Sequence, residues 1–478
     1  MKKDLLAGMR NGEALSRRNQ IELVLRLSIP AILAQISTIL MEYIDASMVG
    51  HLGSSASAAI GIVSTTTWLV GGLCHAIGTG FTVSIAHTIG AGKDEEARQH
   101  VRAGLLTGLA FSSVLALICA LIHTQFPYWM GAEEAVAEGA SKYFLIFGMT
   151  LPLMQINYTG FGMLECSGNM RLPSIMNVVM CFLDVIFNAL LINSETNLSL
   201  FGGRLLLHLP GAGLGVTGAA LGTFFSELTG AVFVLFALLV FSQKLHLRRG
   251  EKKQLSFHNW CVAVRMSLPV MASSLVMGSA YVLSTKIVSP LGTIAIAANS
   301  FAITAESFCY MPGYGISHAA TTLVGQAKGA KRPPLMKQFS YLCVAMGILL
   351  MALSGVLLYI YAPEMIGILT PDERIRSLGT AILRIEAFAE PMFGASIVIE
   401  GVFRGLGKTI RPTILNLISM WCIRLPLSAF AAARFGLVGV WVVMCAELIF
   451  RGTIFLISMI LEFRAKTEAS PASVSENH

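Results

Sequence analysis

Long apolar runs alternate with short polar segments along the whole chain. A helix that crosses the hydrocarbon core of a bilayer needs about 20 mostly apolar residues. Twelve segments have this length and character, and they lie at residues 27–50, 57–88, 103–123, 143–164, 173–193, 212–241, 266–289, 295–325, 339–361, 379–402, 412–433 and 436–462. The pattern therefore predicts an all-α integral membrane protein with twelve transmembrane helices.

The composition agrees with this class. Of the 478 residues, 55% are hydrophobic and 13% are charged, whereas soluble domains are about one quarter charged. A cytosolic enzyme, a disulfide-stapled secreted domain and a disordered scaffold are thereby excluded. The nine cysteines lie singly, without metal-ligand or redox spacing. A charged amphipathic stretch precedes the first span, and we expect it to remain as a cytoplasmic N-terminus over residues 1–26.

Basic residues are unevenly distributed over the loops. With the N-terminus in the cytoplasm, the cytoplasmic segments hold 23 of the 34 Lys and Arg residues and the opposite loops hold five. The positive-inside rule then places both termini in the cytoplasm of a protein of the cell (inner or plasma) membrane. The net charge of +7 reflects this topology, so the lipid bilayer is the expected partner and nucleic acid is not.

The sequence matches itself at an offset of 239 over about 150 residues. Near the end the offset falls to 221, which leaves about 18 extra residues in the loop 194–211 of the first half. The matched pairs include Ser28 with Ser267, Pro30 with Pro269, Gly90 with Gly329, Pro152 with Pro391, Gly168 with Gly407 and Asn177 with Asn416. We interpret this register as an internal duplication.

Each half holds six spans, so both halves enter the membrane in the same direction. Such parallel repeats are related by a pseudo-two-fold axis along the membrane normal, as in one class of transporters. The predicted organisation is two six-helix lobes, at 27–243 and 262–463, joined by a basic cytoplasmic linker at 244–261 and followed by a cytoplasmic tail at 464–478.

Two of the five aspartates fall inside predicted spans of the first lobe. Ionisable groups in hydrocarbon are costly and usually mark a functional site. Asp45 lies shortly before the outward turn at residues 50–53, in the outer half of the first span. Asp184 lies about 16 Å into the fifth span, near its middle. Asn188 lies one turn further on the same face and Thr223 reaches a similar depth in the sixth span, so we expect these four side chains to converge.

This group of four is open to three interpretations. A buried carboxylate beside another carboxylate can take up and release a proton near neutral pH. The same oxygens of Asp45, Asp184, Asn188 and Thr223 can instead coordinate a hard cation such as sodium. The third interpretation is a set of hydrogen-bonded packing residues. Nothing else in the sequence indicates a metal site, and no cofactor is expected.

The second lobe holds candidates for contact with a cationic substrate, namely Glu306 in the eighth span and Glu390 and Glu400 in the tenth. Lys286 in the seventh span is their expected partner. An internal ion pair is therefore an alternative to substrate contact for these residues. In the first lobe, Asn157 is a further candidate for substrate contact.

The sequence resembles the multidrug and toxic compound extrusion (MATE) family over about residues 25–460. Each shared motif is moderately specific, and the length, the spans and the repeat agree with it. The motifs are IDASMVGHLG (44–53), GAGKDEEA (90–97), GAALGT (218–223), VGQAKGA (324–330), EGVFRGLGKTIRP (400–412) and WCIRLPL (421–427). The resemblance implies efflux of amphipathic, often cationic organic compounds in exchange for protons or sodium.

Within the family the chain is more similar to the DinF-like branch, which implies coupling in the first lobe. Asp45 matches the aspartate of that branch in span 1, and Thr223 matches its threonine in span 6. In span 5 the usual Asn-x-x-x-Asp is reversed to Asp184-Val-Ile-Phe-Asn188, which moves the charge about 5 Å inward on the same face. Phe393 stands where the NorM-like branch has a second-lobe aspartate, which disfavours coupling confined to that lobe.

The predicted function is a monomeric secondary active antiporter, not an enzyme, that exports small amphipathic organic cations by alternating access. Protons are the expected coupling ion and sodium is the alternative. A flippase for lipid-linked or polyisoprenoid substrates is the alternative function. An intramembrane enzyme is disfavoured because the spans carry no Ser/His, HExxH or paired Gly-Asp protease pattern, and a channel because no repeated filter loop is present.

Overall fold

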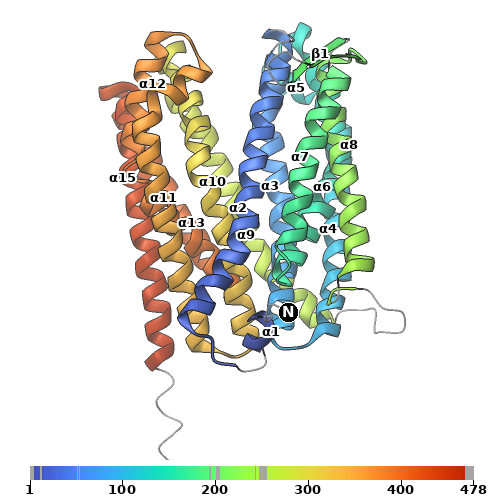
Figure 1. Ribbon diagram of the computed structural model, residues 1–478. Coiled ribbons are helices and arrows are strands. Elements are labelled where there is room, and N and C mark those ends of the chain that lie inside the picture. Colours follow the sequence, from blue (N-terminus) through green and yellow to red (C-terminus); the bar gives the residue numbers. More distant parts are fainter. Residues whose placement is uncertain are drawn as a thin grey trace, which may run out of the picture. The chain divides into compact units, whose positions relative to one another are not determined.

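The computed structural model describes residues 5–10, 13–50, 52, 54–192, 195–200, 205–242, 244–246 and 256–468. Figure 1 shows its helices and strands. In the first half of the chain they are α1 (Leu5–Arg10), α2 (Arg17–Gly50), α3 (Ser54–Gly90), α4 (Asp94–Ile122), α5 (Phe126–Trp129), α6 (Glu134–Cys166), α7 (Arg171–Ile192), β1 (Glu195–Leu200), β2 (Leu205–Pro210), α8 (Gly215–Phe236) and the π-helical η1 (Ala237–Phe241). In the second half they are α9 (Phe257–Val288), the short 3₁₀ helix η2 (Ser289–Leu291), α10 (Thr293–Gly329), α11 (Pro333–Leu369), α12 (Glu373–Glu386), α13 (Glu390–Gly405), α14 (Ile410–Leu417), the π-helical η3 (Ile418–Arg424) and α15 (Leu425–Glu468).

All twelve predicted spans fall on helical segments, and the all-α class is confirmed. Within the described chain, nine segments are long and apolar enough to cross a membrane. The last of them, Ile410–Arg464, covers two predicted spans. The two spans are separated at Gly436, where the backbone leaves helical geometry (φ 62°, ψ −148°). The other two predicted spans lie on α6 and on the pair α12 and α13. With 14 and 16 residues, α12 and α13 are each too short to cross alone.

The helix boundaries repeat at the same offset as the sequence. α3 runs from Ser54 to Gly90 and α10 from Thr293 to Gly329, so both ends of these helices keep the offset. The start of α6 and the start of α12 differ by the same offset, as do the end of α6 and the end of α13. The starts of α4 and α11, and those of α7 and α14, also differ by this offset. Unrelated apolar helices would not share this register, so the fold supports the predicted duplication.

The equivalent prolines Pro152 and Pro391 have different effects. α6 continues as one helix of 33 residues across Pro152. Near Pro391 the chain ends α12 at Glu386 and starts α13 at Glu390, with the proline in the first turn. A proline is tolerated there because its missing N–H would have no partner within the helix. The break leaves two buried glutamates at adjoining helix ends.

The chain divides into two compact units. The N-unit is Leu33–Gly278, and the C-unit combines Met1–Ile32 with Ser279–His478. The sequence predicts lobes at 27–243 and 262–463, divided at the linker. The boundaries of the compact units instead lie inside α2 and α9, so each of these helices contributes to both units.

Side-chain contacts hold the first part of α2 in the C-unit and the first part of α9 in the N-unit. Gln20 near the start of α2 donates to Gln338 Oε1 of α11 at 2.8 Å, within the C-unit. Ser267 of α9 donates to the carbonyl of Ile77 on α3 at 2.7 Å, within the N-unit. The N–H of Gly80 donates back to the Ser267 hydroxyl at 3.0 Å. Because α2 and α9 are repeat equivalents, both repeats contribute a helix start to the other unit.

The extra loop of the first half forms a short hairpin. β1 pairs antiparallel with β2, from Glu195 opposite Pro210 to Leu200 opposite Leu205. This hairpin is an addition to the predicted all-α fold. Parts of four predicted segments lie outside the described residues, namely 1–4 and 11–12 of the N-terminus, 194 and 201–204 of this loop, 247–255 of the linker and 469–478 of the tail.

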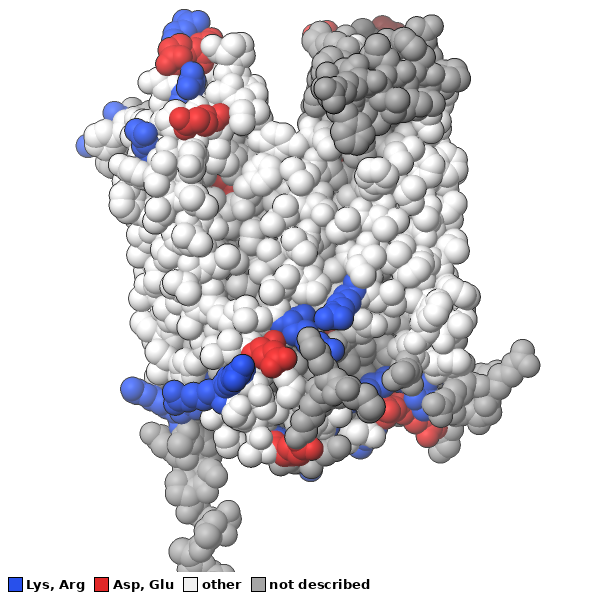
Figure 2. Space-filling view, viewed as in Figure 1, with Lys and Arg blue, Asp and Glu red and all other residues white. Residues whose placement is uncertain are grey.

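Charged side chains gather toward the ends of the helices. In Figure 2 the middle of the visible face is almost free of Lys, Arg, Asp and Glu. Large apolar side chains elsewhere remain exposed, for example Leu349 at 71%, Leu106 at 68% and Phe182 at 67%. Apolar surface of this kind suits contact with lipid rather than with water.

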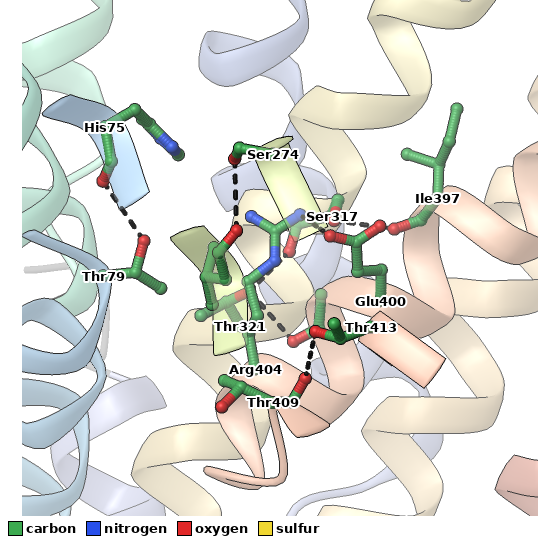
Figure 3. A network of polar contacts seen from close by, with 12 residues as sticks. His75, Thr79, Ser274, Ser317, Thr321, Ile397, Glu400, Arg404, Thr409 and Thr413 are labelled. Atoms are coloured by element: carbon green, nitrogen blue, oxygen red, sulfur yellow. Dashed lines mark hydrogen bonds and ion pairs between the residues drawn. The ribbon is translucent and has the colours of Figure 1, made fainter. Parts of the chain in front are cut away.

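Hydroxyl groups and glycine join α10 to α13 within the C-unit (Figure 3). Ser317 donates to the carbonyl of Ile397 at 2.9 Å. Thr321 donates to the carbonyl of Gly401, also at 2.9 Å. A Cβ atom at Gly401 would lie 2.4 Å from the Ser317 carbonyl oxygen, so the close approach requires glycine. This contact fixes α13, which carries two of the predicted site glutamates.

Candidate functional site

The structure brings the four predicted coupling residues together in the N-unit. Asn188 Nδ2 donates to Asp184 Oδ2, one turn earlier on α7, at 2.9 Å. The same amide group donates to Asp45 Oδ1 on α2 at 2.8 Å. The Asp45 carboxyl group and Thr223 on α8 also lie close to Asp184, and the Thr223 hydroxyl donates to the carbonyl of Ala219 at 3.4 Å. Three helices therefore meet at Asp184, and we call Asp45, Asp184, Asn188 and Thr223 the N-unit site.

The burial of the N-unit site limits its charge. Asp184 and Asn188 are each 1% exposed, and Asp45 is half-buried. The two carboxyl groups are joined through the Asn188 amide and lie close together, and two ionised carboxylates at such a site repel each other, which favours a proton on one of them. Within the described chain, no group of three or more His, Cys, Asp or Glu side chains is arranged to hold a metal ion. The two carboxyl groups could share a proton, whereas a sodium ion would also need oxygens from Asn188 and Thr223.

Small residues on α8 allow α7 to carry Asn188 into the N-unit site. A Cβ atom at Gly222 would lie 2.0 Å from Asn188 Oδ1. One turn earlier, a Cβ atom at Gly218 would lie 2.4 Å from the Leu191 carbonyl oxygen. One turn later, Ser226 donates to the carbonyl of Met180 at 2.8 Å. The one-turn spacing of these residues on α8 lets the two backbones approach, which positions the Asn188 amide.

Glu227 joins this region although the sequence offered no partner for it. Asn157 Nδ2 of α6 donates to Glu227 Oε2 at 2.6 Å and to its backbone carbonyl at 2.9 Å. Asn157 is 2% exposed, and Glu227 lies close enough to Asp184 for their charges to interact. The available signal was the one-turn spacing from Thr223 to Glu227 on one helix. Asn157, predicted to contact substrate, is therefore bound to a carboxylate beside the N-unit site.

The predicted partnership of Lys286 with the glutamates of the second lobe is wrong. Lys286 lies exposed near the end of α9, and it forms no ion pair with any described residue. Glu400 instead pairs with Arg404, one turn later on α13, at 3.0 Å (Figure 3). Glu306 and Glu390 are buried, at 5% and 1% exposure. Glu400 has a partner within its own helix because that spacing places both side chains on one face.

A buried ion-pair network near Glu306 was also not predicted from the sequence. Arg451 donates to both carboxylate oxygens of Glu447, each at 2.8 Å. Ser419 of η3 donates to the same carboxylate, and Arg424 lies 3.7 Å from it. Glu447 and Arg451 stand one turn apart in an apolar span, and this spacing was the signal in the sequence.

A family comparison settles the class of this chain. The MatE family model matches residues 30–190 and 269–430. The starting residues of the two matches differ by the offset of the internal repeat. The chain belongs to the MatE family. It is therefore a multi-pass membrane protein of the MATE transporters, and the resemblance seen in its motifs is confirmed.

Curated relatives match nearly the whole MatE chain. A probable multidrug resistance protein NorM of Thermotoga maritima is 27% identical over 441 residues, which cover 91% of each chain. A probable multidrug resistance protein NorM of Xanthomonas axonopodis pv. citri is 25% identical over 465 residues, covering 94% of this chain and 95% of its own. These relatives carry the NorM name, so the DinF-like branch stays a prediction.

Solved structures share the fold. A crystal structure of MATE in complex with MaL6 has a TM-score of 0.87 at 18% identity and covers 98% of this chain and 100% of its own. A transporter of the MOP superfamily from Pyrococcus furiosus, described with a binding pocket of reverse polarity, has a TM-score of 0.85 at 18% identity and covers 97% of this chain and 99% of its own. At this identity the likeness establishes the MATE fold alone, and the two-lobe architecture predicted from the repeat agrees with it.

Proposed function

We propose that this transporter is a secondary active antiporter that exports amphipathic organic cations in exchange for protons. Asn188 carries the proposal, because its amide joins the carboxyl groups of Asp45 and Asp184 across two helices. A proton taken up there changes both the charge and the hydrogen bonding at the junction of α2 and α7. The relatives named multidrug resistance proteins support export of small organic molecules.

The proposed cycle links protonation to conformation. A proton that enters from outside neutralises the pair Asp45 and Asp184, and the bonds from Asn188 rearrange. α2, α7 and α8 then move, and the cation leaves toward the outside. A proton can drive this change only if it binds one conformation more strongly than the other. The hydrogen bond from Asn188 to Asp45 gives such a difference, because it exists only while α2 and α7 meet.

The remaining predicted contacts stay part of the proposal. We propose that the substrate contacts Asn157, Glu306, Glu390 and Glu400, together with Lys286. We further propose a monomer without cofactor in the cell (inner or plasma) membrane, with both termini in the cytoplasm. The uneven distribution of Lys and Arg over the loops supports this orientation.

Proteoliposomes of defined orientation test the proposal. Export of a fluorescent organic cation is compared under an imposed proton gradient and an imposed sodium gradient. We expect proton-driven export that is lost in Asp45→Asn. Asp372→Asn is the matched control, because Asp372 caps α12 through the N–H of Arg374 outside the N-unit, and asparagine caps a helix equally well.

The other outcomes separate the alternatives. Export driven only by the sodium gradient would indicate that sodium, and not a proton, is the coupling ion bound at Asp45, Asp184, Asn188 and Thr223. Wild-type export by Asp45→Asn would contradict coupling at this site. Lipid scrambling without export under either gradient would indicate the flippase. A flippase for such substrates would be expected to hold several cationic residues in its central cavity, and the two candidates, Lys286 and Arg424, differ in setting: Lys286 is exposed and Arg424 lies beside Glu447.

A further inference from the structure

Three glutamates lie close together inside the C-unit. Glu306 on α10 is 5% exposed, Glu386 at the end of α12 is 0% exposed, and Glu390 at the start of α13 is 1% exposed. Their charges are close enough to interact with one another. The break between α12 and α13 brings Glu386 and Glu390 side by side in the chain with both side chains buried.

Two of these carboxyl groups have no hydrogen-bond partner. Both oxygens of Glu386 and both oxygens of Glu390 are buried and unpaired within the described chain. α11 closes over Glu390, because a Cβ atom at Gly355 would lie 3.1 Å from Glu390 Cβ. No donor group of the described chain therefore stabilises a negative charge on these four oxygens.

The surrounding charges do not balance three ionised glutamates. Arg451 is already held by both oxygens of Glu447. Arg424 is the remaining nearby cation of the described chain, and it also lies beside Glu447. The ionisable groups that face the three glutamates are Cys309 from α10, Arg424 from η3, and Cys445, Glu447 and Arg451 from α15. At most one of the three glutamates thus has a positive charge to balance it.

An ionised carboxylate that is buried without hydrogen-bond donors or a balancing cation is strongly unfavourable. A carboxyl group in that position takes up a proton instead, and like charges nearby act in the same direction. The described chain arranges no group of three or more His, Cys, Asp or Glu side chains that could hold a metal ion. We infer that Glu306, Glu386 and Glu390 form a second proton-binding site, in the C-unit, with protons on Glu386 and Glu390 at neutral pH.

This C-unit site is not a copy of the N-unit site. At the repeat offset, Asp45 corresponds to Ser284 and Asp184 corresponds to Ile423. The carboxyl groups of the C-unit therefore lie at positions of their own in the repeat. The inference is separate from the proposed function, since it concerns protons bound by the resting protein and does not depend on what the protein transports.

Infrared spectroscopy of the full chain in lipid nanodiscs tests the inference without substrate or gradient. Protonated carboxyl groups absorb apart from carboxylates, so each protonated glutamate can be followed through substitution. We expect Glu386→Gln and Glu390→Gln each to remove one carboxyl equivalent from the protonated band at neutral pH. Glu462→Gln is the matched control, because Glu462 is 3% exposed but paired with Lys408 at 2.7 Å and Arg411 at 2.8 Å. This variant should leave the protonated band unchanged.

Two results would overturn the inference. One is a protonated band that is the same in Glu386→Gln, Glu390→Gln and wild type. The other is a band that appears only when sodium is replaced by choline, which would show a cation in place of the protons. Should a glutamine variant not fold, Glu386→Asp keeps a carboxyl group at a new position and must shift the band, and an unshifted band would equally refute the protonation of Glu386. Failure here leaves the export test of Asp45→Asn unaffected.

Discussion

An alanine at position 222 should disable the N-unit site without replacing any of its members. The Cβ atom that Gly222→Ala adds would lie 2.0 Å from Asn188 Oδ1 and 2.9 Å from Asn188 Cγ, whereas ordinary contacts begin at 3.4 Å. The backbone nitrogen of Asn188 lies only 3.2 Å from the same point, so the backbone of α7 is also in the way. The Asn188 side chain must turn aside, which breaks its bonds to Asp45 and Asp184.

The size of the effect follows from these contacts. Overpacking of this kind costs about 1–3 kcal/mol of stability. A hydrogen bond to a charged group contributes about 1.5–3 kcal/mol, and Asn188 bonds both carboxyl groups, of which one is ionised. Loss of the bond to the ionised carboxylate exceeds the roughly 1.4 kcal/mol that corresponds to a tenfold change in rate. We therefore expect proton-driven export to fall at least about tenfold in Gly222→Ala.

The assay combines dye export from proteoliposomes with thermal unfolding of the purified protein. Gly61→Ala on α3 is the matched control, because a Cβ atom at Gly61 would meet nothing within 4 Å. The double variant Gly222→Ala with Asn188→Ala removes the clashing side chain, so its loss of stability should be smaller than the sum of the two single losses. Wild-type export by Gly222→Ala, or strictly additive losses in the double variant, would refute the reasoning.

Two further predictions concern the buried polar contacts of each unit. Glu447→Gln should lower stability by about 3–5 kcal/mol because it leaves Arg451 buried without its counter-charge, and adding Arg451→Gln should recover part of this loss; additive losses in unfolding experiments would contradict the pairing. Ser267→Ala should lower stability by about 1–3 kcal/mol because it removes the two hydrogen bonds that the Ser267 hydroxyl makes with the N–H of Gly80 and the carbonyl of Ile77. Ser274→Ala, whose hydroxyl bonds within its own helix, is the control, and equal unfolding temperatures for the two serine variants would contradict the prediction.

The sequence alone determined the helices, their order and their duplication. In a membrane each spanning segment must satisfy its own backbone hydrogen bonds, so the length of an apolar run is enough to predict a helix. The repeat offset is likewise a property of the chain, and the helix boundaries share it. The bond from Asn188 to Asp184 spans one helical turn, so the spacing of the two residues predicted it.

Only the tertiary structure decided which side chains meet across helices. It places Asn157 on Glu227, buries Glu386, leaves Lys286 exposed and exchanges the starts of α2 and α9 between the two units. These contacts depend on how each helix is rotated about its axis. An apolar span does not encode that rotation clearly, because lipid tails and the protein interior are similarly apolar and the helices associate through packing and polar contacts instead.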